Sequence, residues 1–466
     1  MYGILASTDS NIIKHQENIT FILNRRGTND TVWYQDTNGY VFAHTLPITR
    51  GKEPLKQLII DNEGILLFTG ELWNVPSNEP DALVFLQRIR TYGLSHAIKN
   101  THGNWAFVYW DNKNKYLSFA TDEVGEQPLH YAYLNENIYV ASEIKILVSA
   151  GVPLRFIHHV RPCNLYRLKG GLQISPTRLL TARNRWNSFN PDILHQRIAK
   201  AVKEKTTSVD LQRIGLLISG GIDSTIIAYE ASLLGIRRAW TIVADPNSID
   251  AVRARIIADK FNLDWTLIIA QPRSPEIGII MGEVSNRSIV EELCLHVILA
   301  QLISKDGIRV VLTGTGADEV FIGYSHLLGR VHKTLLQERF LLSLYRYDLR
   351  AFNKVFMGYG VKVRNPFLSR DVIIYALQLH ADILLGPSRI LKWPLRLAYG
   401  DLLGHLDNQQ VLIARETMGV KRIFEEKFGS SPYIYRKVWQ QVLKDHNEIT
   451  KWLQEADQFN GVVDIR

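Results

Sequence analysis

The chain has 466 residues, of which 46% are hydrophobic and 21% are charged, as is typical of a globular protein of two or three domains. No apolar run approaches the roughly 20 residues that span a bilayer, and the first residues lack the basic and apolar regions of a signal peptide. Two cysteines, Cys163 and Cys294, are too few for a disulfide scaffold, so we expect a cytoplasmic protein without a membrane segment. The net charge of +8 permits an anionic ligand, but the basic residues are dispersed, which disfavours nucleic acid as a partner.

Short strands separated by turn residues are predicted for the first part of the chain, up to about residue 175. Asn38-Gly39, residues 62–64 and residues 112–114 each lie between apolar or alternating runs and predict hairpins. Residues 65–69 and 105–110 are dense in β-branched and aromatic side chains and predict buried strands, whereas one apolar face over residues 79–90 predicts a helix. We therefore expect a β-rich α+β sandwich with helical insertions.

Apolar strands alternate with helices from about residue 190 to the end of the chain. The strand candidates are residues 214–218, 239–243, 265–269 and 310–313, and the helix candidates between them are residues 224–234, 249–261 and 289–304. This alternation predicts an α/β domain whose parallel sheet carries helices on both faces. Ligands of such sheets bind beyond the carboxyl ends of the strands, so the segments that follow residues 218 and 313 are the first places to look for a site.

The segment after the first of these strands has the composition of an anion-binding loop. Two glycines break the strand, and a helix is predicted to open at Ser224, so backbone N–H groups and the helix dipole point toward a bound anion. The serine hydroxyls add donors, whereas a carboxylate in the loop would repel bare phosphate unless Mg²⁺ lies between them. No Gly-Lys-Ser/Thr follows, which excludes the Walker pattern. The candidate nucleotide-binding residues here are Leu217, Ser219, Gly220, Gly221, Asp223 and Ser224.

A second glycine-rich segment follows the strand at residues 310–313. Gly314 and Gly316 predict a tight turn, and Asp318 and Glu319 come directly after it. Since the two strand ends lie on the same edge of a parallel sheet, Asp223 and Asp318 could together bind Mg²⁺, which usually takes one or two carboxylates with phosphate and water oxygens.

Other polar residues are given a structural interpretation. Glu291 and Glu292 precede an apolar helical run and are interpreted as partners of a helix N-terminus rather than as substrate contacts. The histidines, among them His296, have no zinc-ligand spacing and are expected to be core or surface residues.

These motifs resemble those of the asparagine synthetase class B and β-lactam synthetase superfamily of ATP pyrophosphatases. Residues 219–224 resemble its Ser-Gly-Gly-x-Asp-Ser loop, and residues 314–324 resemble its Gly-x-Gly-x-Asp-Glu-x-x-x-Gly-Tyr motif. The segments 70–74, 103–107, 122–131 and 141–145 resemble the superfamily's glutaminase domain. The resemblance implies an Ntn-hydrolase-like domain over residues 1–180 and a synthetase domain, of the adenine nucleotide α-hydrolase type, over residues 190–466.

The glutaminase-like part departs from the superfamily pattern. An active glutaminase needs a cysteine nucleophile directly after the initiator Met, and here that position is Tyr2, whose phenol is a poor nucleophile at neutral pH. The Asp-Gly pair that would bind the substrate amine is His102-Gly103, and the glycine after Asn74 is Val75. We therefore expect a degenerate domain without glutaminase activity.

The resemblance also implies further site residues. Val243 ends the strand on the adenine side, Lys392 opens a Lys-x-x-Leu-Arg helix, and Arg415 begins a segment similar to the Arg-x-Lys loop. The lysine of that loop is replaced by Thr417, so we expect Lys421 to reach the same phosphates. Glutamate or tyrosine stands between the two glycines of the second motif in the superfamily. Here that residue is Thr315, whose hydroxyl is too weak an acid or base to move a proton alone.

These residues together predict an AMP-forming ligase that uses ATP and Mg²⁺ to join a small-molecule or peptide carboxylate to an amine. The amine may be intramolecular, as in β-lactam synthetase or lasso-peptide cyclisation, or separate, and a setting in antibiotic or other natural-product biosynthesis is favoured by analogy. The alternative is a nucleotide-binding pseudoenzyme or regulatory subunit, and the sequence leaves a homodimer open. A nucleic-acid-modifying ATP pyrophosphatase is disfavoured by the sandwich domain and the dispersed charge.

Overall fold

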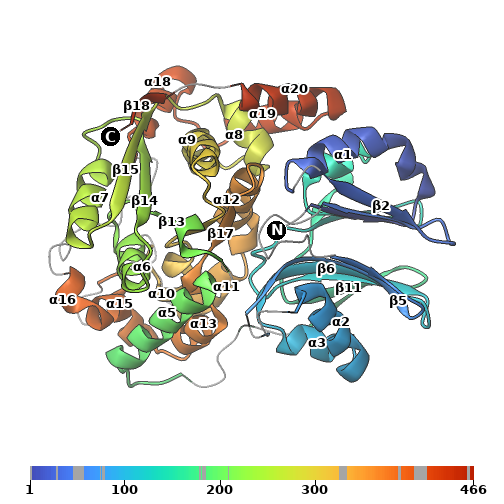
Figure 1. The fold of residues 1–466 in the computed structure, drawn as a ribbon, viewed down its shortest axis with the longest axis horizontal. Coiled ribbons are helices and arrows are strands. Elements are labelled where there is room, and N and C mark those ends of the chain that lie inside the picture. The colour runs from blue at the N-terminus through green and yellow to red at the C-terminus, as the bar shows by residue number, and fades with distance from the viewer. Residues whose placement is uncertain are drawn as a thin grey trace.

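The computed structural model describes residues 3–27, 30–45, 57–73, 75, 79–177, 180, 185–207, 209–324, 333–386, 390–403, 417–458 and 462–465. The N-terminal part, blue to cyan in Figure 1, is a stack of sheets beside a larger body in which helices surround a third sheet. The α+β sandwich followed by an α/β parallel-sheet domain is confirmed. No described helix combines the length and apolar character that a membrane crossing requires.

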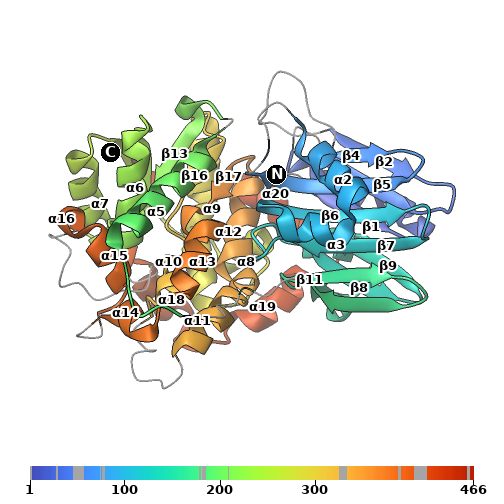
Figure 2. The same ribbon diagram turned by 90° about the horizontal axis from the view of Figure 1, so that it is seen from below.

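Two six-stranded antiparallel sheets form the N-terminal sandwich (Figure 2). In the first, of order β10-β8-β9-β1-β3-β2, the strands are β1 (Ile4–Ser7), β2 (Thr31–Gln35), β3 (Val41–Thr45), β8 (His130–Leu134), β9 (Asn137–Ala141) and β10 (His158–His159). In the second, of order β12-β11-β7-β6-β5-β4, they are β4 (Leu58–Ile60), β5 (Gly64–Leu72), β6 (Gly103–Asp111), β7 (Tyr116–Thr121), β11 (Asn164–Leu168) and β12 (Leu172–Pro176). Helices α1 (Gln16–Asn24) and α4 (Ile144–Ser149) pack on the first sheet, and α2 (Asp81–Tyr92) and α3 (Leu94–Asn100) lie against the second.

The apolar faces of the two sheets meet in one core. Phe42, Val108 and Phe119 are fully buried there, as expected of strands with alternating apolar residues. The three predicted hairpins are confirmed, because β2 pairs with β3, β4 with β5, and β6 with β7. Strands β5 and β6 stay in register from Gly64 opposite Asp111 to Leu72 opposite Gly103.

The third sheet has the order β17-β16-β13-β14-β15-β18. Its strands are β13 (Ile214–Leu217), β14 (Arg238–Val243), β15 (Asp264–Ala270), β16 (Val310–Leu312), β17 (Lys362–Arg364) and β18 (Val462–Ile465). The first five are parallel, and β18 pairs antiparallel with β15. The four predicted strands are confirmed, and the sequence prediction missed β17 and β18, which are too short to give a periodic signal.

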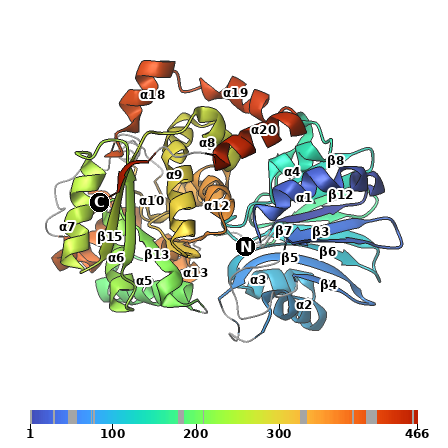
Figure 3. The same cartoon turned by 45° about the horizontal axis from the view of Figure 1, so that its top comes forward.

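Helices cover both faces of this sheet, as predicted. The described helices of this part are α5 (Pro191–Thr206), α6 (Ile222–Leu233), α7 (Ile249–Lys260), α8 (Pro275–Gly282), α9 (Arg287–Lys305), α10 (Ala317–Phe321), α11 (Lys333–Leu341), α12 (Asp348–Met357), α13 (Arg370–Leu377), α14 (Ala381–Leu385), α15 (Trp393–Ala398), α16 (Gly400–Leu403), α18 (Val420–Phe428), α19 (Tyr435–Val442) and α20 (His446–Asp457). The helix predicted to open at Ser224 begins two residues earlier, at Ile222. Figure 3 shows α18, α19 and α20 arching from the third sheet to the sandwich, where His446 contacts Ser149 of α4.

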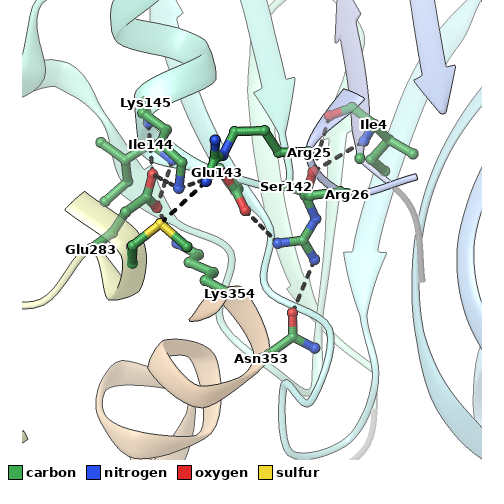
Figure 4. A network of polar contacts seen from close by, with 12 residues as sticks. Ile4, Arg25, Arg26, Ser142, Glu143, Ile144, Lys145, Glu283, Asn353 and Lys354 are labelled. Carbon is green, nitrogen blue, oxygen red and sulfur yellow. Dashed lines mark hydrogen bonds and ion pairs between the residues drawn. The ribbon is translucent and has the colours of Figure 1, made fainter. Parts of the chain in front are cut away.

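Buried charged residues hold the two parts of the chain together (Figure 4). Glu283, at the end of α8, accepts hydrogen bonds from the backbone N–H groups of Ile144 and Lys145 of α4, at 2.9 and 2.8 Å. The same carboxylate pairs with Lys354 of α12. Nearby, Arg26 pairs with Glu143 and donates to Asn353 of α12. This side of the interface is therefore polar and held by ion pairs and hydrogen bonds, which favour one orientation of the two parts.

Candidate active site

The first glycine-rich loop is held in shape by its own serines. The Ser219 and Ser224 hydroxyls lie 3.2 Å apart, and the Ser219 N–H donates to the Ser224 hydroxyl. Gly220 has a φ of +72°, and a Cβ there would lie 2.2 Å from the Cβ of Arg253, so only glycine fits. Helix α6 starts after Gly221 without a side-chain cap. Its first N–H groups are therefore available to an anion.

The second loop packs directly against the first. A Cβ on Gly314 would lie 2.6 Å from the Cβ of Asp223 and 2.9 Å from the nitrogen of Ser224. The loop itself is closed by Thr313, whose hydroxyl accepts from the N–H of Thr315 and lies 3.0 Å from the Thr315 hydroxyl. Because β13 and β16 are neighbouring parallel strands, both loops extend beyond the same edge of the sheet, as the sequence predicted.

Asp223 and Asp318 point to a common position, which is filled by the ammonium group of Lys392. The Lys392 Nζ lies 2.5 Å from Asp223 Oδ2 and 2.8 Å from Asp318 Oδ1. Lys392 precedes α15 and is only 3% exposed. Two carboxylates from the first turns of α6 and α10, which are far apart in the sequence, therefore converge with a lysine from a third segment.

Burial makes this cluster costly to charge. Burial outweighs the attraction of Lys392 and, with the neighbouring Asp318, raises the pKa of Asp223 to about 6. Burial, reinforced by Asp318, also raises the pKa of Glu319 to about 8, and Glu319 accepts a hydrogen bond from the Tyr324 hydroxyl. The site thus holds closely spaced acids that a second cation would stabilise.

The residues present fit a divalent cation of the magnesium type. Asp223 Oδ1 is buried without a hydrogen-bond partner, so it retains an oxygen that can act as a ligand. The described residues contain no group of three or more His, Cys, Asp or Glu side chains arranged to hold a metal. The chain therefore offers a pair of carboxylates, and the remaining ligands would have to come from nucleotide and water, as is usual for Mg²⁺.

A cavity of about 590 Å³ opens over the two loops. Its described lining brings together Leu217, Ser219, Gly221, Asp223, Ser224, Gly314, Thr315, Gly316 and Asp318, which are all sequence-predicted site residues. Trp240, Thr241 and Ile242 of β14 line it as well. Six carboxylates also lie among the described lining residues, without a lysine or arginine: Asp223, Asp250, Glu292, Asp318, Glu319 and Asp348.

Other predicted site residues lie elsewhere. Val243 is fully buried and packs with Ala251 in a separate apolar cluster, so the neighbouring residues of its strand line the cavity instead. Lys421 stands in the first turn of α18 and lines a separate hollow, apart from the described lining of the cavity. Thr417, at the position of the missing lysine, bonds Asp250. Tyr2 and Arg415 lie outside the described residues.

One wall of the cavity, formed by α9, could not be predicted from the sequence. Ser288, Glu292, His296 and Leu299 lie along one side of α9 and line it, as their spacing of three and four residues allows. Glu292 was interpreted as a helix-terminus partner, but it stands in the second turn of α9 and faces the cavity. Burial lowers the pKa of His296 to about 4, so this side chain is neutral near pH 7. The helical period was visible in the sequence, but the direction in which that face points was not.

The glutaminase-like motifs mostly build the interface. Glu71 pairs with Arg364 at 2.8 Å and with Lys362 at 2.8 Å across the two parts of the chain. Asp122 accepts from the backbone N–H groups of four residues, 124–127, and thereby shapes its own loop. His102 lies 2.5 Å from Arg370. Glu71 and His102 thus join the two parts of the chain, and Asp122 shapes a loop.

Comparison with known proteins agrees with this architecture. Residues 1–160 match the family model of the glutamine amidotransferase domain, and residues 194–337 match that of asparagine synthase. These two matches support an assignment to the class B asparagine synthetase-like superfamily. Its curated relatives include asparagine synthetase [glutamine-hydrolyzing] 2 of Oryza sativa subsp. japonica, which is 27% identical over 79% of this chain and 67% of that protein. A putative asparagine synthetase of Methanocaldococcus jannaschii is 24% identical over 60% of this chain and 57% of that protein.

The match covers only part of the length of these relatives. The chain spans 57%, 61% and 65% of the length of three of the first four relatives. Among solved structures, a glutamine phosphoribosylpyrophosphate amidotransferase of B. subtilis is 14% identical over 58% of this chain and 82% of that chain, with a TM-score of 0.30, too low to carry an argument.

Proposed function

We propose that this protein is an ATP-dependent carbon–nitrogen ligase that adenylates a carboxylate and then lets an amine displace AMP. The observation that supports the proposal most directly is the convergence of Asp223 and Asp318 on one position, marked by the ammonium group of Lys392. Both aspartates line a cavity large enough for a nucleotide and a small substrate group. Fold stability alone does not call for two partly buried carboxylates that converge at a sheet edge.

The reaction is a pair of substitutions. A carboxylate oxygen of the substrate attacks the α-phosphorus of ATP, the bond to the bridging oxygen of the β-phosphate breaks, and pyrophosphate leaves. The amine nitrogen then bonds to the acyl carbon, AMP leaves, and the amine loses a proton. The N–H groups at the start of α6 bind and orient the phosphates. A magnesium ion held by Asp223 and Asp318 would neutralise charge on the departing diphosphate.

The acidic lining of the cavity favours an amine as the second substrate. Asp348 and Glu292 lie among the described lining residues on the side of α12 and α9. Burial, with Asp318 nearby, raises the pKa of Asp348 to about 6, which leaves it largely ionised at pH 7. These carboxylates attract a cationic ammonium group and raise its local concentration.

Glutamine is not expected to supply the amine. Tyr2 stands where a glutaminase needs a thiol. In addition, His102 replaces the aspartate that would bind the amine of glutamine, and it contacts Arg370. A different amine, intramolecular or separate, then completes the reaction, and natural-product biosynthesis is the setting favoured by analogy.

Replacement of either aspartate tests the proposal. Asp223→Asn and Asp318→Asn should each lower ATP–pyrophosphate exchange by about 10²-fold or more, with a fractionated metabolite extract as the source of the carboxylate substrate. The reason is that an amide in place of either carboxylate weakens binding of the magnesium ion that would neutralise the departing diphosphate. The readout is label transfer from pyrophosphate into ATP. Asp371→Asn is the matched control, since Asp371 pairs with Lys200 on the outer side of α13, and it should exchange as the wild type does.

The outcomes separate the proposal from folding defects. Both variants should keep the circular dichroism spectrum and a cooperative melting transition. Exchange that persists in both would overturn the assignment of the site, and exchange lost in Asp371→Asn as well would point to an effect on folding.

A second candidate, a nucleotide-binding protein without ligase activity, is favoured by one observation. Thr315 and Thr417 stand where the superfamily has groups that move protons or bind phosphate, and Lys421 lies apart from the described lining of the cavity. Such a protein would bind ATP and still give no exchange with any fraction of the extract. The wild-type measurement above therefore decides between the two candidates.

A further inference from the structure

Lys392 is held in its position by unusual backbone geometry. Its φ of +56° is left-handed, a conformation that a side chain other than glycine seldom adopts. The stem of the lysine then runs past Gly323, where a Cβ would lie 2.3 Å from Lys392 Cε and 1.7 Å from Asp318 Oδ1. Strain of this kind persists only where the surroundings fix it, and it is a frequent feature of functional sites.

The ammonium group occupies the space that a metal would need. It lies 2.5 and 2.8 Å from one oxygen of each aspartate, whereas Mg²⁺ binds carboxylate oxygens at about 2.0–2.1 Å. A cation bound to both carboxylates would therefore come close to Nζ, and the two positive charges would repel each other. The ammonium group must either move or gain new anionic partners for the metal to enter.

Without Lys392 the aspartates would face each other without the cation that contacts both of them, although the charge of Arg396 would still act on Asp223. Both line a cavity whose other described lining residues include four further carboxylates and no lysine or arginine. Lys392, which contacts both carboxylates, is thus the cation that holds the pair converged before ligands arrive.

We propose that Lys392 is a positioning residue that holds Asp223 and Asp318 together in the empty site and couples metal entry to nucleotide entry. The coupling arises because Lys392 loses its carboxylate partners when the metal binds them, and the phosphate oxygens of the nucleotide replace those partners. This inference rests on the proposed function for the identity of the nucleotide. Metal alone should bind the protein weakly, and metal with nucleotide should bind tightly.

Manganese binding to the nucleotide-free protein is the test, with Lys392→Met as the variant. Free Mn²⁺, measured by electron paramagnetic resonance, should reveal one site per chain in Lys392→Met with at least tenfold higher affinity than in the wild type. Adding a non-hydrolysable ATP analogue should tighten Mn²⁺ binding strongly in the wild type and much less in the variant. Equal or weaker Mn²⁺ binding by Lys392→Met would overturn the inference.

Two further variants keep the test clear. Lys362→Met is the matched control, because Lys362 is equally buried and pairs with Glu71 outside the described lining of the cavity. It should lose thermal stability without responding to Mn²⁺, whereas Mn²⁺ should restore the melting temperature of Lys392→Met. The double variant Lys392→Met with Asp223→Asn should lose the gained Mn²⁺ site. A melting temperature of Lys392→Met that Mn²⁺ leaves unchanged would contradict the proposal.

These measurements do not depend on catalysis. Tighter Mn²⁺ binding by Lys392→Met in a protein that makes no AMP would support the role of Lys392 and reject the ligase. If the wild-type protein makes AMP but Lys392→Met binds Mn²⁺ no better than the wild type, the ligase is supported and the role of Lys392 is rejected.

Discussion

At the residue scale, two glycines allow the close contacts on which the site depends. Gly314 lets the second loop touch the backbone of Asp223 and Ser224, and Gly323 leaves room for Asp318 and the stem of Lys392. Neither position has a positive φ, so the reason for glycine is close approach rather than backbone conformation. A methyl group at either position would push apart the residues that have to converge.

Gly323→Ala should therefore disable the site more than it destabilises the fold. The added Cβ would overlap Asp318 Oδ1, so the carboxylate and Lys392 must shift, and ATP–pyrophosphate exchange should fall by about 10²-fold, as expected when catalytic groups are misplaced by an ångström. Gly400→Ala is the control, because a Cβ there meets nothing within 4 Å. Normal exchange by Gly323→Ala would show that the site tolerates the displacement.

Helix α4 shows at the scale of elements how the two parts of the chain depend on each other. Its first N–H groups are capped by Glu283, which belongs to the other part of the chain. Lys145, Lys354 and these N–H groups together outweigh burial and lower the pKa of Glu283 to about 2. The helix N-terminus thus contributes to the interface through its orphan donors and its dipole.

Glu283→Ala should destabilise the protein by about 3–5 kcal/mol, the usual cost of removing one partner from a buried ion pair. Lys354 would lose its counter-ion, and two N–H groups of α4 would lose their acceptor. Urea unfolding at pH 7 measures the loss. Glu283→Gln keeps an oxygen that can accept and should lose less, so an equal loss in both variants would argue that charge, rather than capping, dominates.

At the scale of the whole molecule, the interface between the two parts of the chain contains a buried pair of histidines. The Nδ1 atoms of His130 and His159 lie 2.9 Å apart, Lys354 Nζ lies 2.7 Å from His130, and Arg350 contacts His159. Burial, followed by the positive charge of Lys354 and Arg350, lowers the pKa of both histidines well below 6.5. Glu283, 3.9 Å from His130, is the one acid within ion-pairing distance among the described residues.

The free energy of unfolding should therefore fall as the pH is lowered below about 6.5. The unfolded chain binds protons at both histidines in that range while the folded chain does not, so acid favours the unfolded state. Stability from the neutral pair is fully present above the unfolded pKa and is lost below it. Urea unfolding between pH 7.5 and 5 measures the slope, which His130→Gln with His159→Asn should flatten. A slope that is the same in the double variant would exclude the pair as its source.

Much of the fold could be predicted because its signals are local. Apolar runs fixed β13, β14, β15 and β16, and glycines after strands marked two loops whose strands proved to be parallel neighbours. That Asp223 and Asp318 share one sheet edge followed from this pattern alone. The sequence does not show which side chain lies between these two aspartates, however. The position of Lys392 between them came only from the structure.

The sequence by itself determined the fold class, both loops and their shared edge, because strand and turn preferences act over a few neighbouring residues. The tertiary structure decided which helix faces line the cavity. It turned Glu292 and His296 of α9 inward, and it carried Lys421 on α18 to a separate hollow. A helix with apolar residues on several sides can pack in more than one rotation, and only contacts between segments distant in the chain select one of them.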